Sequence, residues 1–442
     1  MSQSAKPVFP PLEADSWPIA RQWSRLDDLC EGVFDCPHTT PVIRNEGPYV
    51  VRSQDVRTGI FRLDQAAHVS EETYQERIAR AEPRFGDILY SREGTYFGLA
   101  AEVPRGVRVC LGQRMVLIRP SDKIDTRFLR LWLNSPVLHR HIMGFRDGTV
   151  AERLNMPTIR GLPVPHISLP EQLAIAATLG ALDDKIEANR KMNATLEAMA
   201  RALFRDWFVD FGPTRARMEG RPPYLSPNLW SLFPARMDDE GKPEGWEEKP
   251  LDEIADFLNG LALQKFPAEQ GIDSLAVIKI AELRNGITAN SNRASRKVPP
   301  QYVVQDGDFL FSWSGSLLAK FWTGGEGALN QHLFKVASQR YPAWFFSEWV
   351  QHHLADFQVI AASKATTMGH IQRGHLNAAM TICPPDRTIA TLGEVVAPLI
   401  DRIVRNELES RTLAQTRDLL LPRLMSGELR VAEAESLARE VA

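Results

Sequence analysis

The short motifs of this chain that come closest to catalytic patterns each lack an essential feature. Gly94-Thr95-Tyr96-Phe97-Gly98 lacks the Lys-Ser/Thr ending with which a Walker loop holds phosphate. Ser312-Trp313-Ser314-Gly315-Ser316 lacks the spacing of a nucleophile elbow. Cys383-Pro384-Pro385-Asp386 has the prolines of an amino-methyltransferase motif but neither of its flanking residues. We therefore expect no catalytic site in this chain.

Metal ligands are not gathered along the sequence either. His370 and His375 stand five residues apart without a cysteine or acidic partner nearby, which favours a structural or polar-contact role. The cysteines form no CxxC pair, so we interpret them as reduced and structural. They are Cys30, Cys36, Cys110 and Cys383.

Composition and charge narrow the class of protein. A chain of 442 residues with 44% hydrophobic and 24% charged residues is typical of a globular protein with two to four domains. No apolar run reaches the roughly 18 residues of a membrane span, and Met1 to Pro11 lacks an apolar signal core, so we expect a cytoplasmic protein. The net charge of −3 argues mildly against a nucleic-acid partner.

The distribution of charge is more informative than its sum. Residues 1–165 have a net charge of +2 and residues 246–385 of −1, whereas the segments 170–211 and 386–442 each have −2. Residues 1–165 also contain 20 arginines but only 2 lysines. The guanidinium group of arginine forms bidentate hydrogen bonds with phosphates and guanine edges better than the lysine ammonium does. A genome-wide preference for arginine codons is the alternative explanation.

A long helical pattern occurs twice in the sequence, at an offset of 217 residues. It predicts the two helices that position the other segments. Both copies have the 4-3-4-3 spacing of a coiled-coil seam and turn polar at the same two central steps. Polar then meets polar in an antiparallel pair; the alternative is that these residues face solvent at a skip in the seam. The first copy of the seam is Ile175, Leu179, Leu182, Ile186, Asn189, Asn193, Leu196, Ala200, Leu203 and Trp207, and the second is Leu392, Val396, Leu399, Ile403, Asn406, Ser410, Leu413, Arg417, Leu420 and Leu424.

Each long helix closes one half of the chain, which predicts an α+β fold with a pseudo-two-fold internal repeat. Two mixed α/β globular domains are expected, separated by two long helices that form an antiparallel coiled coil. A helix over 173–208 would be roughly 54 Å long at 1.5 Å per residue. The predicted segments are a first globular domain at 1–168, a helix at 169–211, a linker at 212–245, a second globular domain at 246–385, a second helix at 386–430 and a C-terminal tail at 431–442.

Longer motifs carry a family resemblance. The runs 169–176, 182–190, 196–204 and 207–211 closely resemble the first conserved spacer of type I restriction–modification specificity (S) subunits. The runs 307–316, 327–336 and 364–371 resemble a target-recognition domain of the same family. The first globular domain matches less well, through residues 86–92 and the Leu154…Ile159…Leu162 run, although the resemblance extends over about residues 17–430.

The resemblance implies a non-catalytic subunit that places two target-recognition domains, 1–168 and 246–385, on the halves of a split, asymmetric site in double-stranded DNA. The spacer helices, 169–211 and 386–430, would set the gap and dock two methyltransferase subunits. Those subunits would methylate adenine N6 with S-adenosylmethionine after flipping the base. Restriction subunits that use ATP and Mg²⁺ would translocate and cleave, and this chain itself would bind no cofactor, no metal and no membrane.

Residues for reading DNA are then sought among polar side chains for base edges and cations for phosphates. For each of them a turn-forming or strand-end hydrogen bond is the alternative role. The candidates are Arg92, Arg146 and Thr149 in the first domain, and Ser314, Ser316, Asn330, Gln331, His332, Lys364, Thr366, Thr367 and His370 in the second.

Two other functions fit parts of the pattern. The chain could be a coiled-coil scaffold that brings proteins together without reading DNA, in which case partner binding would have no effect on DNA. It could also be a cryptic nuclease or methyltransferase, in which case the purified chain alone would be active with S-adenosylmethionine. The missing motifs argue against the second of these functions.

A charge at position 364 provides a test. Lys364→Ala should weaken binding to all DNA sequences alike and reduce the slope of log affinity against log salt by about one, because one phosphate contact is lost. Fluorescence anisotropy over a salt series measures both quantities. Unchanged affinity and slope would remove Lys364 from the candidates.

Overall fold

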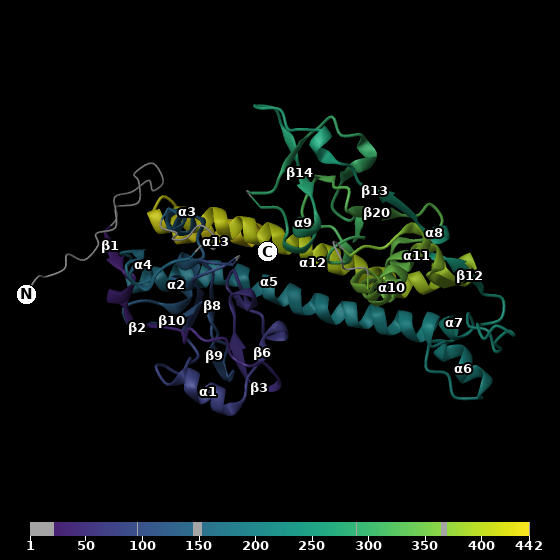
Figure 1. Ribbon diagram of the computed structural model, residues 1–442, viewed down its shortest axis with the longest axis horizontal. Helices are drawn as coiled ribbons and strands as arrows, with labels where there is room; N and C mark the ends of the chain where they lie inside the picture. The colour runs from purple at the N-terminus through teal and green to yellow at the C-terminus, as the bar shows by residue number, and fades with distance from the viewer. Residues whose placement is uncertain (1–21, 95, 145–152, 289, 364–368, 442) are drawn as a thin grey trace, which may run out of the picture. The chain divides into compact units, whose positions relative to one another are not determined.

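The computed structural model describes residues 22–94, 96–144, 153–288, 290–363 and 369–441. The contacts of the chain divide it into two compact units: unit 1 runs to Glu187 and resumes at Thr412, and unit 2 is Ala188–Arg411. Two long helices, α5 (Leu169–Phe204) and α12 (Asp386–Ser426), contribute residues to both units (Figure 1). No helix in the described ranges combines the length and apolar character that crossing a membrane requires.

Unit 1 contains short strands and helices. The strands are β1 (Trp23–Arg25), β2 (Cys30–Asp35), β3 (Arg44–Val51), β4 (Val56–Arg57), β5 (Ile60–Phe61), β6 (Ala67–His68), β7 (Ile88–Ser91), β8 (Ala100–Glu102), β9 (Val109–Leu111), β10 (Met115–Pro120) and β11 (Pro163–Pro165). The helices besides α5 and α12 are α1 (Glu71–Ile78), α2 (Thr126–Leu133), α3 (Pro136–Met143), α4 (Met156–Arg160) and α13 (Val431–Val441).

The main sheet of unit 1 is antiparallel, with four strands in the order β2-β10-β7-β8. A second sheet has the order β6-β3-β9, in which β3 and β9 are parallel. Side chains of β7 and β10, such as Tyr90 and Val116, share one buried core with Phe128 and Trp132 of α2. This core fixes the ends of the strands against the helices.

Local sequence explains why two helices follow β10. The Asp125 carboxylate accepts a hydrogen bond from the backbone N–H of Phe128 and caps α2. The Ser135 hydroxyl does the same for Leu138 at the start of α3, and Pro136 occupies the first turn of that helix. The chain therefore begins a new helix at Pro136.

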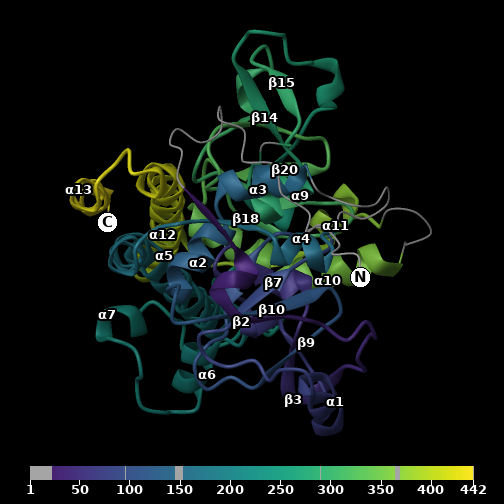
Figure 2. The ribbon, with the colours of Figure 1, turned by 90° about the vertical axis from the view of Figure 1, so that its left-hand side faces the viewer.

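The C-terminal segment 431–442, predicted to be a tail, instead contains a helix. Helix α13 follows α12 after a short turn, and Figure 2 shows it beside α12. Its Ala434 and Ala438 are buried in the core that also holds Ile175, Leu179 and Leu182 of α5 and the C-terminal part of α12. The small side chains of these alanines permit close helix packing, and their weak hydrophobic signal explains why the sequence pattern did not reveal the helix.

A line of ion pairs crosses the interior of unit 1. The Arg130 guanidinium bonds the Glu102 carboxylate at 2.8 Å and the Asp183 carboxylate at 2.8 Å. The other Asp183 oxygen accepts from Arg417 of α12 at 2.7 Å. Burial opposes the charged form of Arg417, yet Asp183 and Asp418 together raise its pKa. Each of these charges is therefore compensated by its neighbour, as buried charges require.

Unit 2 also contains a four-stranded main sheet and a second sheet. Its strands are β12 (Glu247–Pro250), β13 (Asp256–Asn259), β14 (Ser274–Ile278), β15 (Arg293–Ser295), β16 (Val303–Val304), β17 (Phe309–Ser312), β18 (Ala319–Phe321), β19 (Gly327–Leu329), β20 (Leu333–Ala337) and β21 (Met380–Cys383). Its helices besides α5 and α12 are α6 (Gly212–Met218), α7 (Pro227–Trp230), α8 (Leu251–Ile254), α9 (Ile280–Asn285), α10 (Ala343–Ser363) and α11 (Arg373–Ala378).

The main sheet of unit 2 is antiparallel, in the order β13-β20-β17-β18. A second sheet, β15-β14-β19-β16, contains one parallel pair, β14 with β19. One core joins Phe309 and Phe311 of the main sheet to α10 and to residues of α5 and α12 such as Ala200 and Ile403. The main sheet of unit 2 is thus packed on the two long helices.

Three asparagines on the long helices form a buried polar layer in unit 2. Asn189, Asn193 and Asn406 are 2%, 8% and 0% exposed. Asn406 Nδ2 donates to Asn193 Oδ1 at 2.7 Å, and Asn193 Nδ2 donates to the Ile403 carbonyl at 3.2 Å. Asn189 Nδ2 donates to Glu409 at 2.7 Å. These residues are therefore buried rather than solvent-facing, and later residues of α5 meet earlier residues of α12.

The segment 212–245, predicted to be a linker, packs against the core of unit 2. Helix α5 continues as a π-helix, Arg205–Val209, and α6 begins immediately afterwards at Gly212. Phe233 is buried against Trp207 and Trp246, with ring centroids 6.1 and 5.9 Å apart. Aromatic contacts hold the connection to the core of unit 2.

The polar layer can be tested by a double-mutant cycle. Asn193→Leu should lower the free energy of unfolding by about 1–3 kcal/mol, because it leaves the buried Asn406 amide without its acceptor. Adding Asn406→Leu should recover most of this loss, since both polar partners are then gone. Urea denaturation measures each variant. Equal, additive losses would show that the two amides act independently.

Candidate nucleic-acid interface

The candidate site of unit 2 lies just beyond the ends of three neighbouring strands of the main sheet. The ladder between β17 and β20 ends at the pair Ser312 and Leu333. On the other side of β20, Asn259 at the end of β13 pairs with Phe334. The next residues along β17 and β20, Trp313 and His332, therefore meet beside Asn259.

Side-chain contacts join these residues into one cluster. Trp313 Nε1 donates to Asn259 Oδ1 at 2.9 Å and to the Gln331 carbonyl at 3.1 Å. The Ser314 hydroxyl lies 2.9 Å from His332 Nδ1, and the Gln331 amide nitrogen lies 3.3 Å from His332 Nε2. Gln331 and His332 are half-buried and Asn259 is exposed, so polar atoms of the cluster reach the surface.

A third segment closes the cluster. Gly315 N–H donates to the Gly369 carbonyl at 2.7 Å, and Ile371 N–H donates to the Trp313 carbonyl at 2.9 Å. His370 forms a β-bridge with Ser314, and its ring lies 6.3 Å from the Trp313 ring in an edge-on arrangement. The structure thus brings together four of the predicted residues, Ser314, Gln331, His332 and His370.

The other predicted residues of unit 2 are placed differently. Ser316 is exposed and accepts a hydrogen bond from Arg284 of α9. Asn330 is buried, and its Oδ1 accepts from the backbone N–H of His332 at 3.3 Å, so the turn-forming role describes it. The candidates that lie outside the described residues are Arg146, Thr149, Lys364, Thr366 and Thr367.

Unit 1 carries a second cluster at the same strand ends. The ladder between β7 and β10 ends at the pair Ser91 and Met115, and Asp35 of β2 pairs with Val116. Arg92 follows Ser91, and its guanidinium lies 3.1 Å from the Asp35 carboxylate. Arg92 is therefore largely held in an ion pair.

Two further arginines adjoin this pair. Arg114 Nε lies 3.2 Å from the Glu93 carboxylate, and Arg114 has a φ of 74°, a left-handed conformation that arginine rarely adopts. Glu93 also forms a β-bridge with Arg153, which is exposed. The edge of unit 1 thus presents guanidinium groups where unit 2 presents neutral rings and amides.

Strand register relates the two clusters residue by residue. Arg92 directly follows the last paired residue of β7, as Trp313 follows that of β17. Arg114 directly precedes the first residue of β10, as His332 precedes that of β20. Asp35 matches Asn259 on the next strand, and the Arg92–Asp35 pair matches the Trp313–Asn259 hydrogen bond. Sequence reasoning missed Trp313, Asn259, Arg114 and Arg153. Trp313 lies inside the motif 312–316 and could have been found from the sequence. The other three can be recognised only once the strand pairing is known.

Asp35, Cys36 and His38 bring three potential metal-ligand atoms within 4.8 Å of one another. The Arg92 guanidinium occupies the same carboxylate, which disfavours a second cation there. Burial raises the pKa of the Cys36 thiol, which disfavours the thiolate that a metal needs. These three residues are therefore better suited to stabilise the end of β2 through their contacts than to bind a metal ion.

The clusters can form hydrogen bonds but are not built for nucleophilic catalysis. Ser314 and His332 have the spacing of a nucleophile and base, yet Ser314 is only 2% exposed. The other His332 nitrogen faces the Gln331 amide rather than the carboxylate that would orient a catalytic histidine. Arginine, glutamine and asparagine are among the side chains that read base edges in the major groove.

Comparison with known proteins also indicates a DNA-recognition role. A family model described as "Type I restriction modification DNA specificity domain" matches residues 23–198. The chain is 24% identical over 379 residues to the type I restriction enzyme MjaIX specificity subunit of Methanocaldococcus jannaschii, covering 83% of this chain and 82% of that protein. It is 23% identical over 401 residues to the HindI specificity subunit of Haemophilus influenzae, covering 78% and 86%.

Two solved structures match most of the chain with TM-scores below 0.5. The S subunit of a type I restriction–modification system from M. genitalium has 15% identity and a TM-score of 0.48, covering 92% of this chain and 96% of that one. The HsdS subunit from Thermoanaerobacter tengcongensis has 18% identity and a TM-score of 0.33, covering 93% and 98%. On the sequence matches above, this chain is similar to type I restriction–modification specificity subunits over about four-fifths of its length.

Proposed function

We propose that this chain selects the DNA target of a type I restriction–modification complex, with one strand-end cluster reading each half of a split site. The observation that carries the proposal is the shared register of the two clusters. The same positions hold arginine and aspartate in unit 1 but tryptophan and asparagine in unit 2. One backbone with different polar side chains is what recognition of two different half-sites requires.

We further propose that the chain is an internal duplication with pseudo-two-fold symmetry, joined by an antiparallel coiled coil of α5 and α12. Three pairs of sheets support the duplication: β1-β11 corresponds to β12-β21, β2-β10-β7-β8 to β13-β20-β17-β18, and β6-β3-β9 to the strands β15-β14-β19. The buried asparagine layer, in which successive residues of α5 meet preceding residues of α12, supports the antiparallel direction. Such a polar layer fixes the register of paired helices.

The partners follow from this role. Two methyltransferase subunits would dock on the spacer helices and carry S-adenosylmethionine, and restriction subunits would carry ATP and Mg²⁺. The chain itself would bind DNA in the cytoplasm without a cofactor of its own. A scaffold without DNA readout is not favoured, because it would not need two matched clusters of base-reading side chains at strand ends.

The whole proposal is tested by mapping methylated adenines in a host genome with and without this gene. We expect a split, asymmetric motif whose methylation disappears on deletion and returns on complementation. A methylation pattern that does not depend on the gene would refute DNA selection by this chain.

A single side chain tests the role of unit 2. Gln331→Ala should relax choice at one base pair, reducing discrimination there by about 1–3 kcal/mol, because an amide that can bridge a base edge is lost. Competition binding against single-base variants of the target, with partner subunits present, measures this. The matched control is Gln301→Ala, an exposed glutamine outside the cluster, which should leave every preference unchanged.

A further inference from the structure

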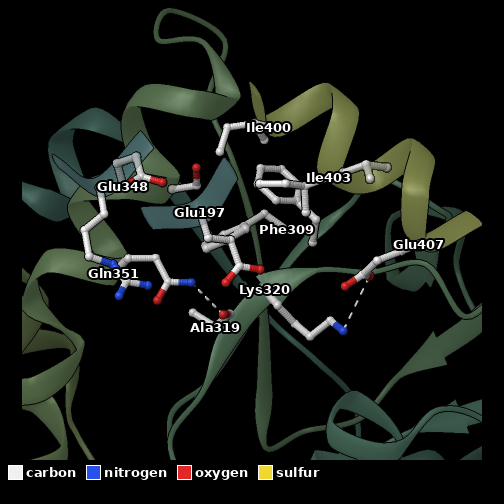
Figure 3. A pocket seen from close by; sticks show the side chains of 13 residues that line it. Glu197, Phe309, Ala319, Lys320, Glu348, Gln351, Ile400, Ile403 and Glu407 are labelled. Atoms are coloured by element: carbon white, nitrogen blue, oxygen red, sulfur yellow. Dashed lines mark hydrogen bonds and ion pairs between the residues drawn. The ribbon is translucent and has the colours of Figure 1, made fainter. Parts of the chain in front are cut away.

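A cavity of about 250 Å³ lies in unit 2, away from the strand-end cluster. It is bounded by α5, α10 and α12 and by the strands β17 and β18, as Figure 3 shows. Sites for drug-sized ligands occupy roughly 300–1,000 Å³, so this cavity suits a smaller molecule. Its lining is mixed: polar and charged side chains share the walls with an apolar part that is formed by Phe309, Phe321, Ala319, Ile400, Ile403 and Val404.

A buried carboxylate, Glu348 of α10, lines this cavity (Figure 3). Glu348 is 9% exposed and makes no hydrogen bond or ion pair within the described part of the chain. Its neighbours do have partners: the Gln351 amide donates to the Ala319 carbonyl at 2.7 Å. A buried carboxylate without a partner is costly in an apolar setting unless it is protonated or meets a cation.

The charged groups at the mouth form no ion pair with Glu348 in the described part of the chain. Lys320 of β18 lies 3.6 Å from Glu407 of α12, and Thr323 also donates to Glu407, so that carboxylate is already engaged. Glu197 and Arg201 of α5 line the cavity and are exposed, and neither forms an ion pair within the described residues. With Lys320 and Glu407 paired, two carboxylates face one guanidinium.

We propose that this cavity is a binding site for a small primary alkylammonium ion. Its ammonium group would lie against Glu348, and its carbon chain would lie along Phe309, Ile400 and Ile403. The ligand would supply the positive charge that Glu348 lacks and would fill the apolar space. This binding is separate from DNA recognition and does not depend on the proposed function.

The charge state of Glu348 sets the pH range of binding. Burial raises the pKa of Glu348 to about 7, with Arg201 lowering it and Glu197 raising it further. The folded protein therefore holds this proton more tightly than the unfolded chain, and stability falls as pH rises from the ordinary range of glutamate through 7. A primary amine with a pKa near 10 stays charged throughout this range, so its binding strengthens as Glu348 ionises.

The experiment uses the full chain and n-butylammonium chloride as the probe, with 1-butanol as the neutral analogue. Isothermal calorimetry and thermal unfolding are measured at pH 6 and pH 8. We expect saturable one-to-one binding that is at least several-fold tighter at pH 8, with a concentration-dependent rise in Tm. Equally tight binding of 1-butanol would show an apolar cavity only and would overturn the proposal.

Variants locate the site. Glu348→Gln should reduce affinity for n-butylammonium at least tenfold, whereas Glu394→Gln, the same change at an exposed position of α12, should not alter it. If Glu348→Gln fails to fold, Glu197→Gln at the mouth should still weaken binding several-fold. Unchanged binding in both cavity variants would contradict the proposal. So would a lack of saturation at ionic strengths that abolish non-specific association. A loss of stability in Arg201→Gln as large as that in Glu348→Gln, without amine binding, would show that these two residues neutralise each other instead.

Discussion

The buried amides between α5 and α12 constrain the rest of unit 2. Asn193 and Asn406 bond each other, and a shift of the helices by one turn would leave both without partners in an apolar seam. The register of the helix pair is therefore set by hydrogen bonds, while the apolar seam supplies most of the stabilisation. Because Phe309 and Phe311 of the main sheet pack into the same core, the amides indirectly fix the strand ends as well.

At those strand ends, the residues that stabilise the fold are different from the residues that reach the surface and can contact DNA. In both units the last ladder pair is buried and apolar or small, and the side chains that reach the surface belong to the next residues along. Arg92 and Trp313 can therefore differ completely without a change in the sheet beneath them. Binding residues carried on loops above a rigid scaffold commonly show this freedom. The cavity beside Glu348 belongs to the scaffold and not to these loops.

The long helices were predictable because their signal repeats over many turns. Most of the seam positions, including Leu179, Asn189 and Val396, are buried as the 4-3-4-3 spacing predicts, and the others, such as Ile186 and Leu399, are half-buried. Four residues of the unit 2 cluster were predicted from their chemistry and motif context. Asn259 was missed because only strand pairing brings it beside Trp313, 54 positions along the chain. The matched residues of the two clusters lie 221 and then 218 positions apart, rather than the 217 of the long helices, because loops of different length separate them.

The ion pairs inside unit 1 have an evolutionary consequence. Glu102, Arg130, Asp183 and Arg417 come from four separate elements, and each neutralises the next. Replacing one of them alone would leave an unpaired charge buried away from water. Exchanging all four for apolar side chains of similar volume could leave the stability of the fold nearly unchanged. These positions should therefore have changed together in descent. Relatives should then carry either the complete charged set or none of it.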